Sequence, residues 1–155
     1  MAQALLKVAA MKCAEMTEPE ITARTPHKNH VRIPTGLLGF EQIKDYVLSA
    51  NPDEEPFAWL HVEDNSALAF VVIDPFVVMP DYKPDIPQAD VQFLQIKQAN
   101  DAILLCIVTI NEGEQPTVNL KGPIVVNRHT HTGKQVIITN AGTYSVKHPL
   151  PVAAE

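Results

Sequence analysis

The sequence predicts a mainly β fold, a small barrel-like domain of short antiparallel strands with one or two short helices. Three observations support this class. Short apolar or alternating segments recur along the chain, turn-forming residues separate them, and only two short stretches show helical spacing. The chain has 155 residues, of which 46% are hydrophobic and 19% charged, so it can bury the core that such a domain requires.

Residues 117–127, TVNLKGPIVVN, are expected to form a strand, a bend and a second strand, and the strand at 103–110 is expected to be central and to pair with the first of them as a hairpin. The first half alternates apolar and polar residues, as a half-buried strand does. The second half holds a continuous apolar run at 124–126, which is typical of a strand covered on both faces. Pro123 has no backbone N–H and restricts Gly122, so the chain must bend between the two halves.

Two polar residues stand out in the first of these strands. Asn119 and Lys121 would project from the same face of an otherwise apolar sheet. They are either an ordinary solvated strip or a contact for a partner, and both are predicted to be partly exposed.

The other elements follow from the same periodicities. Two glycines in PTGLLGFE predict a compact turn over 34–41, and helical spacing predicts short helices over 43–49 and 91–96. We expect one domain over 21–148, an extension over 1–20 that is disordered or weakly helical, and a tail over 149–155. The further strands are expected at 21–24, 30–33, 57–62, 68–73, 103–110, 135–139 and 144–146.

Negative charge is concentrated in one third of the chain. The net charge is −6, but residues 41–90 hold eleven acidic residues against Lys44 and Lys83, a balance of −9. Such a segment repels nucleic acid and would attract a basic protein, so we expect a protein partner and no direct nucleic-acid binding. The candidate partner-binding residues are Asp53, Glu54, Glu55, Glu63, Asp64, Asp81, Asn119 and Lys121.

Catalytic and metal-binding patterns are weak. His129 and His131 would share a strand face and could hold a metal, but they fall in a Thr/Gly turn with no third ligand in the pattern. Asp74 ends an apolar strand before proline, which favours a turn cap over a catalytic carboxylate. Cys106 is expected to pack as a small hydrophobe, and the serines lie outside any nucleophile motif. The sequence therefore predicts no cofactor, no metal and no catalytic site.

The expected location is the cytoplasm. Lys7 and Lys12 interrupt the apolar N-terminal stretch, and every apolar run is too short to span a bilayer, so we expect no membrane association. Cys13 and Cys106 lie far apart without a CxxC pattern, which fits a reducing compartment.

Five segments, taken together and in order, resemble the flagellar assembly factor FliW family. They are GLLGFE at 36–41, PFAWL at 56–60, LAFVVIDPF at 68–76, PDY at 80–82 and VNLKGPIVVN at 118–127. The resemblance covers about residues 33–146, and the chain departs from the pattern at both ends: the leader 1–20 is longer, no glycine stands at 26–29, and the tail 146–155 matches poorly.

The resemblance implies a small β-barrel-like cytoplasmic protein without enzymatic activity. Members of this family bind flagellin and the translational repressor CsrA, so that free FliW sequesters CsrA and relieves repression of flagellin translation. Two alternatives stay open, the first from the residues and the second from the resemblance. One is a small-molecule or metal-binding barrel protein or enzyme that uses His129, His131 or Asp74, and the other is a flagellin chaperone that does not bind CsrA.

Overall fold

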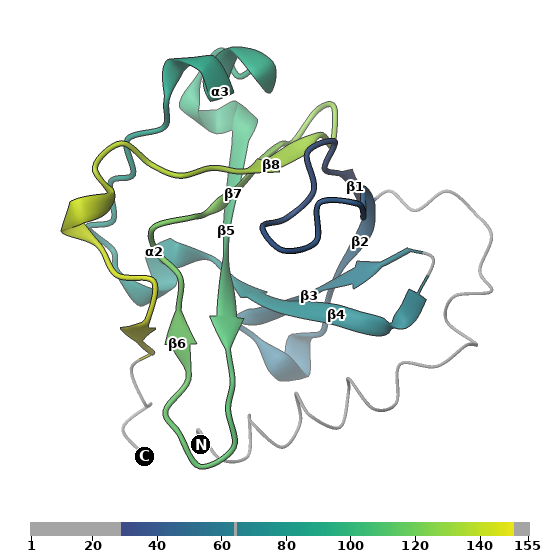
Figure 1. Cartoon of the computed structure of the whole chain (residues 1–155), viewed down its shortest axis with the longest axis vertical. Coiled ribbons are helices and arrows are strands. Elements are labelled where there is room, and N and C mark those ends of the chain that lie inside the picture. The colour runs from purple at the N-terminus through teal and green to yellow at the C-terminus, as the bar shows by residue number, and fades with distance from the viewer. Residues whose placement is uncertain (1–28, 64, 151–155) are drawn as a thin grey trace.

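The computed structural model describes residues 29–63 and 65–150 (Figure 1). The strand expected at 21–24, the extension 1–20, most of the tail, Cys13 and Asp64 lie outside these residues. Within these residues, two short α-helices and three turns of 3₁₀ helix, each of three residues, interrupt a chain that is otherwise strands and loops. In chain order the elements are β1 (His30–Arg32), β2 (Asp45–Ala50), η2 (Pro52–Glu54), β3 (Phe57–Val62), β4 (Asn65–Ile73), α2 (Pro75–Val78), α3 (Gln88–Phe93), η3 (Ala99–Asp101), β5 (Ala102–Thr109), β6 (Thr117–Val118), β7 (Ile124–Asn127), β8 (Gly133–Gln135), η4 (Ala141–Thr143) and β9 (His148–Pro149).

Every strand pair in the sheet is antiparallel, which confirms the predicted fold class. The order is β1-β2-β3-β4-β5-β6-β9, and β7 pairs with both β5 and β8. A lone parallel bridge between Arg32 and Thr132 brings the start of β8 beside β1, but it does not close the sheet. "Barrel-like" is therefore only a loose description of this fold.

Strand β5 is the centre of the sheet, as its continuous apolar sequence predicts. Its second half pairs with β4 and β6, and its first half pairs with β7 from Ala102 opposite Asn127 to Leu105 opposite Ile124. The long vertical arrow in Figure 1 shows this strand crossing the molecule. The predicted bend at Gly122-Pro123 explains the change of partner, because β6 and β7 are two strands separated by that bend.

The core divides into clusters on the two sides of the bent sheet. All four residues of β7 are buried, and its three apolar residues alternate between clusters: Ile124 and Val126 pack with Tyr46 and Leu60, whereas Val125 packs with Leu94 of the α3 region. The prediction that 124–126 is covered on both faces is thus confirmed.

The helix predicted over 43–49 is wrong, because this segment forms strand β2 between β1 and β3. Ile43, Tyr46 and Val47 have helical spacing, but so short an apolar pattern also fits a strand. The neighbouring strands β1 and β3 favour the strand over the helix. Tyr46 packs in the core with Leu60 and Val62 of β3, and strand pairing on both edges satisfies the backbone of β2.

Two strand predictions near the C-terminus also need correction. The strand expected at 135–139 begins earlier as β8, although the extended chain continues beyond it, with Val136 N donating to Pro123 O at 2.9 Å. Residues 144–146 form no strand: η4 precedes them and β9 follows, pairing with β6. The backbone there instead makes isolated hydrogen bonds, in which Leu120 N donates to Ser145 O and Tyr144 N donates to Ala141 O.

Both α-helices of the described residues are short, and the start of α2 follows from the sequence. Asp74 caps α2, its Oδ1 accepting from Phe76 N at 2.9 Å, and Pro75 occupies the first helical turn, where a missing N–H costs least. The predicted helix over 91–96 is observed slightly earlier as α3. Among the described residues, no helix is long and apolar enough to cross a membrane.

The turn over 34–41 is compact, as predicted, and glycine at position 36 is a requirement of its geometry. Gly36 has a φ of +71°, and a Cβ there would lie 2.5 Å from the Cα of Glu41. Buried Leu37 anchors the turn to the core, while Leu38 is directed to solvent. The turn therefore presents the apolar side chain of Leu38 at the surface.

Candidate functional site

The acidic residues predicted to bind a partner are distributed over several places. Asp53 is exposed in η2 and Glu55 directly after it, Glu63 is exposed after β3, and Asp81 is exposed between α2 and α3. Asp64 lies outside the described residues. Glu54 differs from the others, because it is only 6% exposed and accepts a hydrogen bond from Trp59 Nε1 at 3.1 Å. The carboxylate of Glu54 therefore lies at the edge of the core, and Glu54 is not one of the exposed acids that could contact a partner.

The exposed acids fall at opposite ends of one hairpin. Phe57 pairs with Ile73, so the loop that carries Asp53 and Glu55 lies at the same end as Asp74. Glu63 lies at the other end, about 20 Å away for a strand of this length. Since this separation exceeds a Debye length of about 8 Å at physiological salt, the acids form two local fields rather than one surface.

Asn119 and Lys121 are half-buried, as predicted, but they do not form a strand face. Strand β6 ends at Val118, and Asn119 Oδ1 then accepts from the backbone N–H of Lys121 at 3.0 Å and of Gly122 at 3.1 Å. The Asn119 side chain therefore holds the bend that separates β6 from β7.

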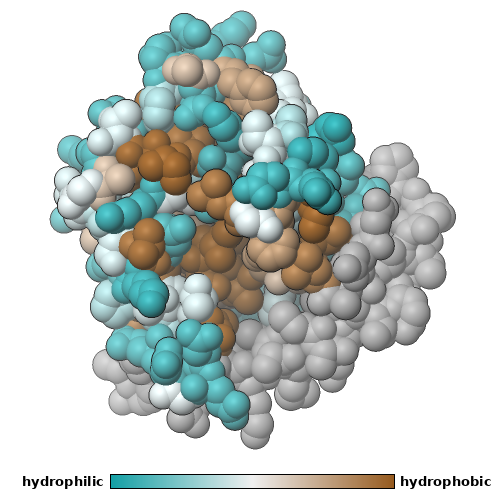
Figure 2. Space-filling view, viewed as in Figure 1, coloured by the Kyte–Doolittle hydropathy of each residue, from teal (hydrophilic) through white to brown (hydrophobic). Residues whose placement is uncertain are grey.

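Apolar side chains gather beside this bend. Gln135 connects the parts: its Oε1 accepts from Leu38 N at 2.9 Å, and its Nε2 donates to Gly122 O at 3.1 Å. Leu38 and Ile137 are 59% and 54% exposed. Figure 2 shows apolar atoms near the middle of this face with hydrophilic residues around them. We call the surface formed by Leu38, Asn119, Lys121, Gln135 and Ile137 the bend surface.

The histidine pair predicted as the metal candidate is not a ligand pair. His131 has a φ of +61°, which breaks the extended backbone that would put both rings on one face. His129 Nε2 instead lies 3.0 Å from Asp101 Oδ1. Asp101 also accepts from the backbone amides of Lys97 and Gln98, and the Lys97 bond is the main cause that lowers the pKa of this carboxyl. This turn is built as a structural cap.

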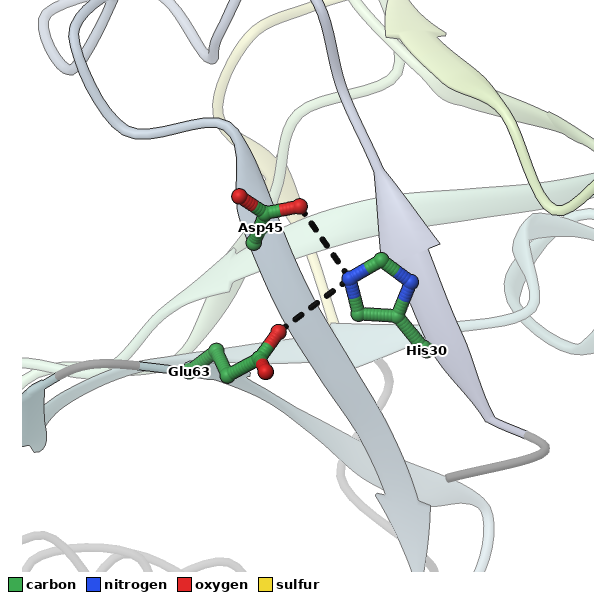
Figure 3. A group of neighbouring side chains, drawn as sticks. All are labelled: His30, Asp45 and Glu63. Carbon is green, nitrogen blue, oxygen red and sulfur yellow. Dashed lines mark hydrogen bonds and ion pairs between the residues drawn. The ribbon is translucent and has the colours of Figure 1, made fainter. Parts of the chain in front are cut away.

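A different histidine lies among carboxylates, and sequence reasoning missed it. His30 Nε2 is 3.1 Å from Asp45 Oδ1 and 3.1 Å from Glu63 Oε1 (Figure 3). Arg32 Nη1 also contacts Asp45 Oδ1, at 2.9 Å. We call His30, Asp45 and Glu63 the His30 cluster. The residue spacing predicts a helix over 43–49, which would not bring these three residues together. Only strand pairing places Asp45 between β1 and the end of β3.

Three further groups, Cys106, Ser49 and Asp74, carry side chains that catalysis could use. Cys106 is fully buried in the core, and burial raises the pKa of its thiol to about 12, so it is not a thiolate nucleophile. Ser49 Oγ lies 2.8 Å from His61 Nε2, a contact between neighbouring strands β2 and β3. Asp74 caps α2, which agrees with the favoured prediction for it.

Comparison with known proteins assigns the family. The family model described as "FliW protein" matches residues 14–150. A flagellar assembly factor FliW from Thermoanaerobacter pseudethanolicus is 41% identical over 117 residues, which are 74% of this chain and 77% of that protein. This chain belongs to the FliW family.

Further matches agree with this assignment. The FliW of Leptospira interrogans (serovar Lai) is 36% identical over 137 residues, covering 86% of this chain and 90% of that protein. A crystal structure of the flagellar assembly factor FliW superimposes with a TM-score of 0.73 at 36% identity, covering 85% of this chain and 92% of that chain. The family resemblance inferred from five ordered segments is therefore confirmed, and with it a role in flagellar assembly.

Proposed function

We propose that this FliW-family protein is a non-enzymatic binding protein of the cytoplasm that binds flagellin and the translational regulator CsrA. Binding to CsrA relieves its repression of flagellin translation. The family match over residues 14–150, together with the FliW crystal structure, is the observation that supports the proposal.

The mechanism we propose is mutually exclusive occupancy. A protein changes the activity of one partner through the other only if the two binding free energies are coupled, and this coupling is reciprocal. Accumulating flagellin then releases CsrA, and exported flagellin leaves the protein free to capture CsrA again.

The bend surface is the proposed contact for one of these partners. An apolar centre with a polar rim is the usual anatomy of a protein interface, and large exposed apolar side chains suit this use. Leu38 and Ile137 supply the apolar part, and Asn119 and Lys121 supply the rim.

The exposed acids are the proposed steering charges for CsrA. Asp53 and Glu55 form one local field, and Glu63 lies in the other, with Asp64 and Asp81 as further candidates from the same acidic third of the chain. The association rate with CsrA should fall as ionic strength rises, because salt screens exposed charges. An association rate that is the same at low and high salt in stopped-flow measurements would remove the steering role.

A competition experiment tests the whole proposal. The purified protein is mixed with CsrA and then with increasing flagellin from the same organism, and the complexes are separated by size. We expect flagellin to displace CsrA. Binding of flagellin alone would favour the chaperone alternative, and binding of neither would contradict the proposal.

Lys121→Glu tests the bend surface in the same experiment. It should weaken one partner by about tenfold while the thermal midpoint stays unchanged, because Lys121 is half-buried at a rim and not in the core. Lys97→Glu is the matched control, since it makes the same change of charge at an exposed residue after α3. If both variants bind the partners equally well, Asn119 and Lys121 are ordinary solvated residues that contact no partner.

The non-enzymatic part of the proposal has its own test. Ser49 and His61 are the described side chains that come nearest to a nucleophile with a base, at 2.8 Å. A fluorophosphonate probe should leave the protein unlabelled. Labelling that disappears in Ser49→Ala would instead support the enzyme alternative.

A further inference from the structure

We propose that the His30 cluster is a binding site for one divalent transition-metal ion, with Zn²⁺ as the preferred ion. The proposal does not rest on the binding function proposed above, although Glu63 belongs both to this cluster and to the proposed steering charges. It uses one imidazole nitrogen and two carboxylate oxygens, a donor set that suits Zn²⁺ better than Mg²⁺ or Ca²⁺.

Strand pairing brings the three donors together. His30 begins β1 and pairs with Val47, so it lies diagonally across from Asp45 on the same face of the sheet. Glu63 N donates to Asp45 O at 3.0 Å, which extends the pairing of β2 and β3 by one residue and places Glu63 next to Asp45. Figure 3 shows the His30 ring with its Nε2 directed between the two carboxylates.

The distances suit a shared ion. In a tetrahedral site with metal–ligand bonds of about 2.1 Å, ligand atoms lie about 3.4 Å apart. His30 Nε2 is 3.1 Å from each carboxylate oxygen, and the three donor atoms all lie within 4.8 Å of one another. Small side-chain rotations would therefore be enough for all three to coordinate one ion, with a fourth position left for water.

The charges favour a cation at this place. Two carboxylate oxygens within 4.8 Å repel each other, and Arg32 contacts only Asp45. Among the ion pairs of the described residues, His30 is the one partner of Glu63. A divalent ion would neutralise both carboxylates at once, whereas the neutral imidazole would act as a ligand and not as a counter-charge.

Arg32 makes the proposal more specific. Its guanidinium holds the same oxygen of Asp45 that would coordinate the ion, at 2.9 Å. The guanidinium and the metal therefore compete for Asp45. Removal of the arginine charge should tighten metal binding, which is the opposite of the effect expected if the cluster were simply a network of ion pairs.

The test is a titration of the tag-free, full-length protein, first freed of metal with a chelator. Zn²⁺ binding is followed by isothermal titration calorimetry, and Co²⁺ is used as a visible-absorption probe of the ligand environment. We expect one ion per chain, at least about tenfold weaker binding in His30→Gln and in Glu63→Gln, and tighter binding in Arg32→Gln. Zn²⁺ should also raise the thermal midpoint of the wild type but not of His30→Gln, because bound ion stabilises the folded state.

His129→Gln is the matched control. Its imidazole also pairs with a carboxylate, at 3.0 Å, but only with one. This variant should bind Zn²⁺ within about twofold of the wild type, because a single carboxylate beside an imidazole does not complete a site. The proposal is overturned if the wild type takes up no Zn²⁺ or Co²⁺, or if His30→Gln and Glu63→Gln bind as the wild type does. Thermal unfolding without metal verifies that each variant is folded.

Discussion

Two histidines in this protein each lie about 3 Å from a carboxylate, yet their surroundings differ. His129 is 66% exposed and contacts Asp101, whose side chain is only 12% exposed. His30 is 35% exposed and contacts Asp45 and Glu63, which are 39% and 45% exposed. One carboxylate is part of the folded framework, and the other two are at the surface.

The partners of the carboxylates explain the difference. Asp101 accepts from two backbone amides, so its position is fixed by the chain and the imidazole is an addition. Within the described residues, the side chains of Asp45 and Glu63 accept hydrogen bonds and ion pairs only from His30 and Arg32. Carboxylates held by backbone amides are committed to structure, whereas carboxylates held only by other side chains can exchange their partner for an ion.

The largest effect should come from the turn that carries His129. Asn127 is 3% exposed, and its side chain donates to Leu94 O and Gln95 O and accepts from the amides of His129 and Thr130. Asn127→Ala leaves these groups without a partner and should lower the free energy of unfolding by about 3 kcal/mol.

Urea unfolding at neutral pH measures this loss. Asn111→Ala is the control, because Asn111 is exposed and makes one long side-chain bond, and it should change stability by less than about 0.5 kcal/mol. If both variants lose less than about 0.5 kcal/mol of unfolding free energy, the turn that carries His129 does not stabilise the fold as proposed.

Much of the fold could be predicted from local patterns. Strands β3, β4, β5 and β7 follow from short apolar or alternating runs, and the caps at Asp74 and the bend at Gly122-Pro123 follow from the chemistry of proline and aspartate. Strand β2 could not be predicted, because its short apolar pattern fits a helix equally well and its neighbours decide between them.

The candidate metal site could not be predicted for a related reason. Spacing along the chain favoured His129 and His131 as metal ligands. The left-handed backbone at His131 breaks the extended conformation that would place both rings on one face. His30, Asp45 and Glu63 have no motif spacing, and only the register of three neighbouring strands brings them together. Local sequence patterns find caps and turns, whereas sites that depend on strand register need the pairing first.

The next largest effect is the dependence of stability on pH at Asp101. The pKa of Asp101 is lowered in the folded protein, first by the Lys97 amide and further by His129. Its contribution to stability is therefore present above the unfolded pKa of 3.8 and is lost as pH falls through the lower folded pKa. Asp101→Asn should lower the free energy of unfolding at neutral pH. Between about pH 5 and about pH 3, the variant should then lose less stability than the wild type does, because it has no carboxylate at this position to protonate.

Urea unfolding at a series of pH values tests this prediction. Asp53→Asn serves as the control, because its exposed carboxylate lies in η2, away from the turn that carries His129. An acid-induced loss as steep in Asp101→Asn as in the wild type would show that Asp101 is not fixed by its backbone partners.

The smallest effect is expected at the His30 cluster in the absence of metal. His30→Gln removes contacts to two carboxylates, but all the side chains of these pairs are at least 35% exposed. Exposed ion pairs contribute little because water and salt screen them, so the free energy of unfolding should change by about 0–1 kcal/mol. The measurement is urea unfolding in the presence of a chelator, beside Asn127→Ala under the same conditions. A loss as large as that of Asn127→Ala would mean that the His30 cluster is itself part of the framework, and the distinction between the two histidines would no longer hold.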